Sequence, residues 1–341
     1  MTTNLSTGRL GKTGPAVSRI ALGAMGMSGM YGSADDAVSI ATVHAALDSG
    51  ANLIDTGDFY GMGHNELLIR QALADRKRED VLLSVKYGAL RGPDNSFGGV
   101  DTRPAATKNF LAYSLQRLGT DYIDIYRPAR LDPNVPIEET IGGLAELVQA
   151  GYIRHIGLSE VGVETLRRAA AVHPIADLQI EYSLMSRGIE AEILPVAREL
   201  GIGITAYGVL SRGLLSDSVR AGQARGGGAQ FAPSDFRAHS PRFQGENLDA
   251  NLLLVEALGK IAAARGVSVA QLAIAWALSR GIDIVPLIGA RKPERWAEAV
   301  AAVDIRLSDA ELATIEAAVP ADRVAGGRYA PAQMAMLDSE R

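Results

Sequence analysis

The chain has 341 residues, of which 47% are hydrophobic and 21% are charged, and its net charge at pH 7 is −5. This composition supplies apolar surface for a large core and lacks the excess of Lys and Arg that binding to nucleic acid or anionic lipid requires. The absence of cysteine excludes disulfides and thiolate metal sites. Residues 1–30 carry no targeting signal and no window is apolar enough to span a bilayer, so we expect a cytoplasmic protein without nucleic-acid or membrane partners.

Short apolar, β-branched runs alternate with helical patterns along the chain. We predict strands at residues 19–22, 52–57, 81–86, 122–127, 153–158, 177–182, 203–208 and 284–289. Strands that alternate with helices pair in parallel through right-handed crossovers. Eight such strands can close a barrel, and the G-x-G-x-x-G fingerprint of an open nucleotide-binding sheet is absent. The sequence therefore predicts an α/β fold, a (β/α)8 TIM barrel, as a single domain over residues 1–341.

Two signals mark the expected helix starts. A serine followed three residues later by Asp, Gln or Glu has the spacing of a reciprocal capping box, which occurs at Ser33, Ser268 and Ser308. Proline costs no hydrogen bond in a first helical turn, and Pro136 and Pro293 fit that position.

The segment between the last two predicted strands is longer than one helix requires. We expect residues 209–247, after the seventh strand, to form a mobile cover over one end of the barrel, because long polar loops in compact domains are usually functional. Helical patterns follow at 248–265 and 269–280. Residues 91–103 are a second candidate cover. Beyond an extra C-terminal helix, the tail at 321–341 either folds back across the same end or stays loose.

One acidic and one basic residue lie within apolar runs. A lone charge in a buried strand costs several kcal/mol unless it is paired, so we predict that Asp55 faces Lys86. Tyr60 follows just beyond the Asp55 strand. A neighbouring ammonium favours the phenolate, so we expect Lys86 to pull the pKa of Tyr60 from about 10 towards neutrality. Tyr60 would then be a usable proton donor.

Polar or special residues also follow other predicted strands. They are Arg127, Ser159, Gln179, Tyr207 and Gly289. Active sites of such barrels lie at the C-terminal ends of the strands. We therefore expect one site at that end of the barrel, called the mouth below.

Several segments together resemble the aldo-keto reductase superfamily. They are NLIDTGDFYG at 52–61, GHNE at 63–66, Lys86 with Gly88, IGLSE at 156–160, LQIEYS at 178–183 and VPLIGARKPERWAE at 285–298. The resemblance runs over about residues 9–320 and keeps the family's order. It implies NADPH-dependent reduction of a small aldehyde or ketone to an alcohol, with the cofactor extended across the mouth. Among such relatives, both monomers and small homo-oligomers occur.

The resemblance also implies residue roles. Tyr60 would be the general acid, Lys86 the neighbour that lowers its pKa, and Asp55 the partner that holds Lys86. Tyr207 matches the ring on which the nicotinamide stacks. The remaining cofactor positions are Gly23 and Met25 beneath the nicotinamide; Ser159, Glu160 and Gln179 at its carboxamide; Leu210, Arg212 and Gly213 over the pyrophosphate; Gly289 at the last strand end; Arg291, Lys292 and Arg295 at the 2′-phosphate; and Glu298 at the adenine.

The chain departs from the family pattern at three positions. Glu160 stands where many members have Asn, and Ala299 stands where an Asn usually touches the adenine. The stretch DYIDIYRPARLDP at 121–133 places Ala129 where the family's tetrad histidine is expected. Three interpretations follow. In the first, Tyr60 and Lys86 suffice for catalysis, and Arg127 or a water holds the substrate oxygen. In the second, the small side chain of Ala129 admits a bulky or conjugated enone substrate. In the third, the barrel binds the cofactor as a sensor or partner subunit with little catalysis.

Residues near the expected mouth indicate the character of the substrate. Aromatic and methionine side chains give an apolar, adjustable lining, which suits aromatic carbonyls. The candidates are Met27, Tyr31, Phe59 and Tyr87. Arg127 and Arg130, on either side of Ala129, would instead select an anionic or polar substrate. No two histidines have the spacing of metal ligands, so we predict no metal site.

Overall fold

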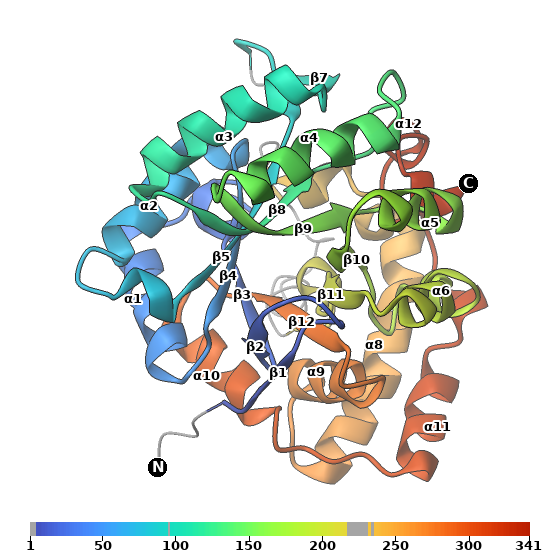
Figure 1. Ribbon diagram of the computed structural model, residues 1–341. Helices are drawn as coiled ribbons and strands as arrows, with labels where there is room; N and C mark the ends of the chain where they lie inside the picture. Colours follow the sequence, from blue (N-terminus) through green and yellow to red (C-terminus); the bar gives the residue numbers. More distant parts are fainter. Residues whose placement is uncertain (1–4, 95, 217–230, 233–234) are drawn as a thin grey trace.

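The computed structural model describes residues 5–94, 96–216, 231–232 and 235–341. Within them, eight parallel strands form a closed barrel (Figure 1). These strands are β3 (Ala21–Gly23), β4 (Leu53–Gly57), β5 (Leu82–Tyr87), β8 (Ile123–Pro128), β9 (Ile153–Ser159), β10 (Ile175–Glu181), β11 (Gly203–Tyr207) and β12 (Ile284–Gly289). Every predicted strand overlaps one of them, and the predicted (β/α)8 barrel is confirmed.

The barrel closes because its first strand also pairs with its last. Ala21 on β3 lies opposite Leu287 on β12, and Gly23 lies opposite Asp55 on β4. The next pairing, between β4 and β5, sets Gly57 opposite Lys86. These registers bring the C-terminal ends of distant strands together at the mouth.

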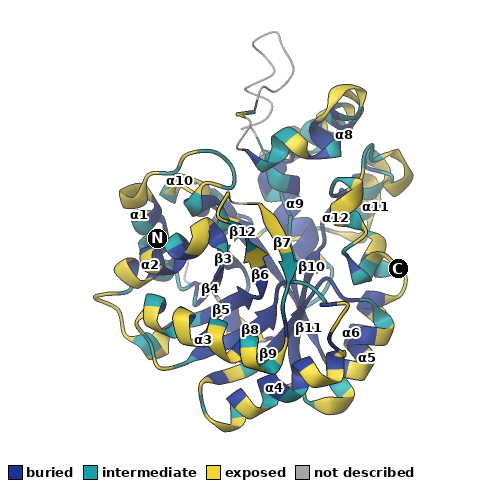
Figure 2. Cartoon of the chain, turned by 90° about the horizontal axis from the view of Figure 1, so that it is seen from above, coloured by how far each residue is buried: buried dark blue, intermediate teal, exposed yellow. Residues whose placement is uncertain are grey.

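Helices surround the barrel, and their exposed sides face outwards (Figure 2). They are α1 (Asp36–Asp48), α2 (His64–Ala72), α3 (Pro104–Leu118), α4 (Ile137–Gln149), α5 (Val163–Val172), α6 (Ile193–Leu200), α8 (Gly245–Arg265), α9 (Val269–Ser279), α10 (Pro293–Ala301) and α11 (Asp309–Ala318). No single helix within the described residues is both long and apolar enough to span a membrane; α8 and α9 qualify only as a pair, and they meet at a bend of 89°.

Some of the predicted helix starts are confirmed and others are not. Capping boxes form at Ser268 and Ser308, and Pro293 opens α10, as predicted. The prediction for Ser33 is wrong, because Asp35 caps α1 by accepting from the Val38 amide at 2.9 Å. Pro136 precedes its helix by one residue: it is the N-cap of α4, with an extended ψ of 137°.

An N-terminal hairpin plugs the end of the barrel opposite the mouth. Its strands are β1 (Thr7–Arg9) and β2 (Ala16–Ser18). Between them Leu10 is fully buried and packs with side chains from the hairpin and from four barrel strands: Val17, Ala21, Leu53, Ile125, Val285 and Leu287. The Lys12 amide donates to the Gly201 carbonyl at 2.6 Å, which ties the plug to the turn before β11.

Several loops border the mouth. One of them is a hairpin of two strands, β6 (Ala89–Arg91) and β7 (Phe97–Val100). Its second strand lies within residues 91–103, the second candidate cover. Of the predicted cover at 209–247, residues 217–230 and 233–234 lie outside the described residues, so its mobility stays a prediction. The C-terminal tail includes α12 (Pro331–Met334) and folds back onto the end of β9, where Ser339 N donates to the Glu160 carbonyl at 3.2 Å.

Candidate active site

A cavity of about 960 Å³ opens at the mouth of the barrel. It is lined by most of the residues predicted for the site: Gly23, Met25, Tyr31, Asp55, Phe59, Tyr60, Lys86, Ala129, Arg130, Ser159, Gln179, Tyr207, Leu210, Arg212, Gly213, Gly289, Arg291, Lys292, Arg295 and Glu298. Four predicted residues do not line it, namely Met27, Tyr87, Arg127 and Glu160. The tail contributes Tyr329, Gln333 and Met336, which the sequence did not indicate.

Asp55 and Lys86 form the predicted buried ion pair. The Lys86 ammonium donates to Asp55 Oδ1 and, at 2.7 Å, to Gln179 Oε1. The other carboxylate oxygen of Asp55 accepts from Ser84 Oγ and from Gln179 Nε2, each at 2.7 Å. Gln179 therefore bridges the two charged groups, a contact in addition to the carboxamide role predicted for it. Burial lowers the pKa of Lys86 to about 8, against the opposing charge of Asp55.

The Tyr60 ring lies beside this pair, with its centroid 5.4 Å from Lys86 Nζ. The predicted fall in its pKa is wrong. Burial raises the pKa of Tyr60 well above the usual value, and the negative charge of Asp55 adds to that shift. The charge of Arg130 lowers the pKa, but by less than burial and Asp55 raise it. Tyr60 is thus a neutral phenol, able to donate a hydrogen bond into the cavity.

Arg127 lies beneath the cavity rather than on its wall, contrary to the prediction. Its side chain is fully buried, and its Nη2 donates to both carboxylate oxygens of Asp177 at 2.8 Å. Its Nη1 donates to Asp55 Oδ2 at 3.3 Å, and the Thr205 hydroxyl also bonds Asp177. Arg127 therefore supports Asp55 from below. Its partner Asp177 is an acid inside an apolar run of the sequence. The burial argument used for Asp55 therefore applies equally to Asp177 and could have indicated that it needs a cation.

Met27 and Tyr87 are also displaced from the predicted pocket. Met27 is buried in the main hydrophobic core. Tyr87 stacks on Tyr126, with ring centroids 4.4 Å apart, and accepts a hydrogen bond from Thr107 Oγ1 at 3.1 Å. The Tyr87 side chain points into the layer between barrel and helices, because alternate residues of a strand such as β5 face opposite sides of the sheet.

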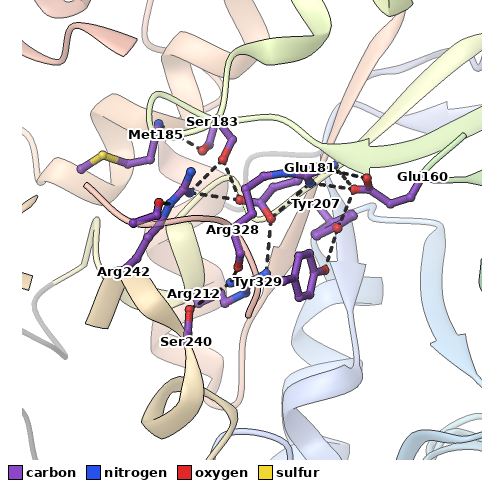
Figure 3. A network of polar contacts seen from close by, with 12 residues as sticks. Glu160, Glu181, Ser183, Met185, Tyr207, Arg212, Ser240, Arg242, Arg328 and Tyr329 are labelled. Atoms are coloured by element: carbon purple, nitrogen blue, oxygen red, sulfur yellow. Dashed lines mark hydrogen bonds and ion pairs between the residues drawn. The ribbon is translucent and has the colours of Figure 1, made fainter. Parts of the chain in front are cut away.

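Glu160 is engaged by the C-terminal tail rather than free for a cofactor, contrary to the prediction (Figure 3). Arg328 donates to both of its carboxylate oxygens at 2.9 Å, and the Ser339 hydroxyl donates at 2.5 Å. Tyr207 also donates to Glu160, at 2.6 Å. Burial by itself would raise the pKa of Glu160, but the hydrogen bonds and charge of Arg328 outweigh it and hold the pKa at about 2. Glu160 is a buried anion that anchors the tail.

A second buried carboxylate, Glu181, extends this network (Figure 3). It accepts from Arg212 and from Arg242, each at 3.3 Å, and from Ser186 at 2.7 Å. Arg212 also donates to the backbone carbonyl of Arg328. The pyrophosphate loop predicted around Arg212 is thus joined to the tail, which agrees with the expectation that the tail folds back across the mouth and not with a loose tail.

A group of cations occupies another part of the cavity wall, around the start of α10. Arg291 donates to the carbonyls of Tyr31 and Ser33 at 3.0 and 3.3 Å. Arg295 pairs with Glu298 at 3.0 Å and remains half exposed. Lys292, which precedes the helix, also lines the cavity.

Comparisons with known proteins agree with the resemblance seen in the sequence. Residues 19–320 match the model of the aldo/keto reductase family. The chain is 41% identical over 326 residues to "Probable aldo-keto reductase 1" of Glycine max, covering 94% of this chain and 91% of that protein. Its fold is similar to the glycerol dehydrogenase AKR11B4 of Gluconobacter oxydans, with a TM-score of 0.81, 33% identity, and 93% and 95% of the two chains covered. An aldo-keto reductase of Klebsiella pneumoniae in complex with NADPH superposes with a TM-score of 0.70, 28% identity, and 93% and 95% coverage.

Proposed function

The chain belongs to the aldo/keto reductase family, which consists of NAD(P)-dependent oxidoreductases, and from this premise we propose that it reduces an aldehyde or ketone to an alcohol with NADPH and with Tyr60 as general acid. The observation that carries the proposal is the position of Asp55, Tyr60 and Lys86 on the wall of one cavity. A cytoplasmic location and a monomeric or small oligomeric state stay predictions.

The cavity suits a nicotinamide dinucleotide in two respects. Ser159 Oγ is buried at the cavity wall without a hydrogen-bond partner among the described residues, so a ligand amide can satisfy it. Arg291, Lys292 and Arg295 supply the cationic donors that a 2′-phosphate requires. We assign these residues to the carboxamide and to the 2′-phosphate respectively. Their contribution would favour NADPH over NADH.

The chemistry divides between cofactor and protein. NADPH, when bound, supplies a hydride to the carbonyl carbon. Tyr60 donates a hydrogen bond to the carbonyl oxygen and then its proton, so that the C=O bond becomes an alcohol. Its raised pKa keeps the phenol protonated until charge develops on that oxygen. The Lys86 ammonium, held by Asp55 and Gln179, stabilises the phenolate that remains.

The small side chain of Ala129 supports a second candidate substrate. It lines the cavity where a histidine was expected and leaves room for a bulky or conjugated enone. The third interpretation, a cofactor-binding sensor with little catalysis, is less well supported because the Asp55, Tyr60 and Lys86 arrangement is complete.

The test is turnover by the purified protein with NADPH and a panel of aldehydes, ketones and enones, with the products identified. We expect alcohols from activated aromatic aldehydes. Tyr60→Phe should lower kcat by about 10³-fold, because general acid catalysis contributes about 10² to 10⁴. The Kd for NADPH, measured by fluorescence, should change little. NADPH binding without turnover across the whole panel would favour the sensor, and reduction at C=C would favour the enone.

A further inference from the structure

Arg130 presents a cation to the cavity without an acidic partner. Its Nη1 donates to the Ala129 carbonyl at 2.7 Å and its Nη2 to the Tyr329 hydroxyl at 3.3 Å. Both acceptors are neutral, and within the described part of the chain no carboxylate lies within salt-bridge distance of this guanidinium. A guanidinium has five N–H donors, so Arg130 retains donors for a ligand.

The other buried cations around the mouth are all paired. Lys86 pairs with Asp55, Arg127 with Asp177, Arg212 and Arg242 with Glu181, and Arg328 with Glu160 and Glu340. Keeping an unpaired charge in a partly dehydrated site costs free energy that a bound anion would offset. The charge balance of this region therefore lacks one negative group beside Arg130.

Arg130 is also at the reacting end of the cavity. It follows Ala129 directly after β8, and its charge acts on both Tyr60 and Lys86. A chain of hydrogen bonds holds it there: Arg130 donates to Tyr329, whose hydroxyl lies 2.8 Å from that of Tyr207. Since Tyr207 donates to Glu160, the Tyr329 hydroxyl is directed as donor towards Tyr207 and accepts from Arg130.

We propose that Arg130 binds a carboxylate of the substrate, so that the protein prefers aldehydes or ketones carrying a carboxylate near the reacting carbonyl. This proposal rests on the proposed function and names its substrate class. Tyr329 acts as a positioning residue, since its hydroxyl fixes the guanidinium. Aromatic side chains on the cavity wall, at Tyr31, Phe59, Phe97 and Phe236, leave an apolar environment for the rest of such a substrate.

The test uses a matched pair of substrates, phenylglyoxylate and its methyl ester, which differ in the anionic group. We expect the wild-type protein to show a higher kcat/KM for the acid. In Arg130→Gln the acid-to-ester ratio of kcat/KM should fall by about 10- to 100-fold, because a charge-assisted hydrogen bond contributes about 1.5 to 3 kcal/mol. The loss should appear mainly in KM for the acid. Arg130→Lys, which keeps the charge, should restore part of the ratio.

A binding measurement and a control variant show whether the change is specific to the carboxylate contact of Arg130. Binding of mandelate, the hydroxy-acid product, to the protein–NADP+ complex should weaken in Arg130→Gln even if turnover is slow. Arg167→Gln is the matched control, because Arg167 is exposed on α5 and pairs with Glu199. The ratio should be unchanged in that variant.

Other outcomes would overturn the inference. A wild-type preference for the ester, or an equal fall in kcat for both substrates in Arg130→Gln, would assign Arg130 to the carbonyl oxygen or to structure. A raised Kd for NADPH alone would assign it to the cofactor. Failure of the proposed function looks different, since wild-type protein would then bind NADPH and reduce neither substrate.

Discussion

Tyr60 and Glu160 have opposite ionisation states in similarly buried surroundings. Burial and the charge of Asp55 raise the pKa of Tyr60, and the charge of Arg130 lowers it by less. Glu160 is equally buried, yet two donors from Arg328 keep it ionised. The presence of a dedicated cationic partner therefore decides the state of each group.

Asp58, two residues before Tyr60, has no such partner. Its Oδ1 is buried without a hydrogen bond among the described residues, and its Oδ2 accepts a long hydrogen bond from the Gly88 amide at 3.4 Å. Burial first, and the neighbouring charge of Glu66 second, raise the pKa of Asp58 to about 7. The folded protein holds this proton more tightly than the unfolded chain does. Stability therefore falls as pH rises from about 4 to 7.

We predict that Asp58→Asn stabilises the protein above pH 7 and much less at pH 4. The gain at pH 8 over that at pH 4 should be a few kcal/mol, since each unit of pKa shift corresponds to about 1.4 kcal/mol. Urea unfolding at both pH values measures it. Asp75→Asn, at an exposed position, is the control. A gain of the same size at both pH values would contradict the assignment.

At the scale of elements, polar contacts attach the C-terminal tail to the barrel. Arg328 reaches Glu160 at the end of β9, and Gly162 N donates to Asp338 at 2.8 Å. The pKa of Glu160 lies below its usual value, so its contribution is complete above about pH 4.5 and is lost as pH falls towards 2. Acid should therefore loosen this attachment.

We predict that Glu160→Gln releases the tail while the barrel stays folded. The change leaves Arg328 with weaker partners, and loss of one member of a buried ion pair costs about 3 to 5 kcal/mol. Hydrogen exchange followed by mass spectrometry should show faster exchange in residues 324–341 than in the wild type, with the barrel strands unaffected. Glu164→Gln, exposed on the neighbouring α5, is the control. Unchanged exchange in the tail would show that other contacts hold it.

At the scale of the whole molecule, the two ends of the barrel differ in what fills them. The mouth holds the cavity and its charges, whereas the opposite end is filled by the apolar plug around Leu10. Gly11 has a φ of +62°, and a Cβ there would lie 2.5 Å from Gly203 N. Only glycine lets the hairpin approach the barrel so closely.

We predict that Leu10→Ala destabilises the fold without changing substrate binding. Removing a fully buried leucine side chain typically costs about 2 to 5 kcal/mol, through lost burial and the cavity left behind. The urea midpoint should fall, while KM for the carbonyl substrate stays within error of the wild type. Leu253→Ala, at a position 67% exposed, should change stability little. A shift in KM without loss of stability would link the plug to the mouth.

The errors made from the sequence share a physical cause. Arg127 is predicted in the substrate pocket because it ends a strand near Ala129, whereas its carboxylate partner, Asp177, lies 50 residues away along the chain. The resemblance assigns Glu160 to the cofactor, and its partner Arg328 lies 168 residues away in a segment without periodicity. The sign of the Tyr60 pKa shift depended on burial and on the sum of several charges. None of these terms can be computed from local pattern.

What the amino-acid sequence determined alone was local: the alternation of strands and helices, the capping boxes at Ser268 and Ser308, and the need to pair Asp55 with Lys86. Each follows from short-range propensity or from the cost of a lone buried charge, and a linear pattern records both. The tertiary structure alone decided which other cations around the mouth find partners, because that depends on distances between elements far apart in the chain. It assigned Arg127 to Asp177 and Arg328 to Glu160, and left Arg130 facing the cavity.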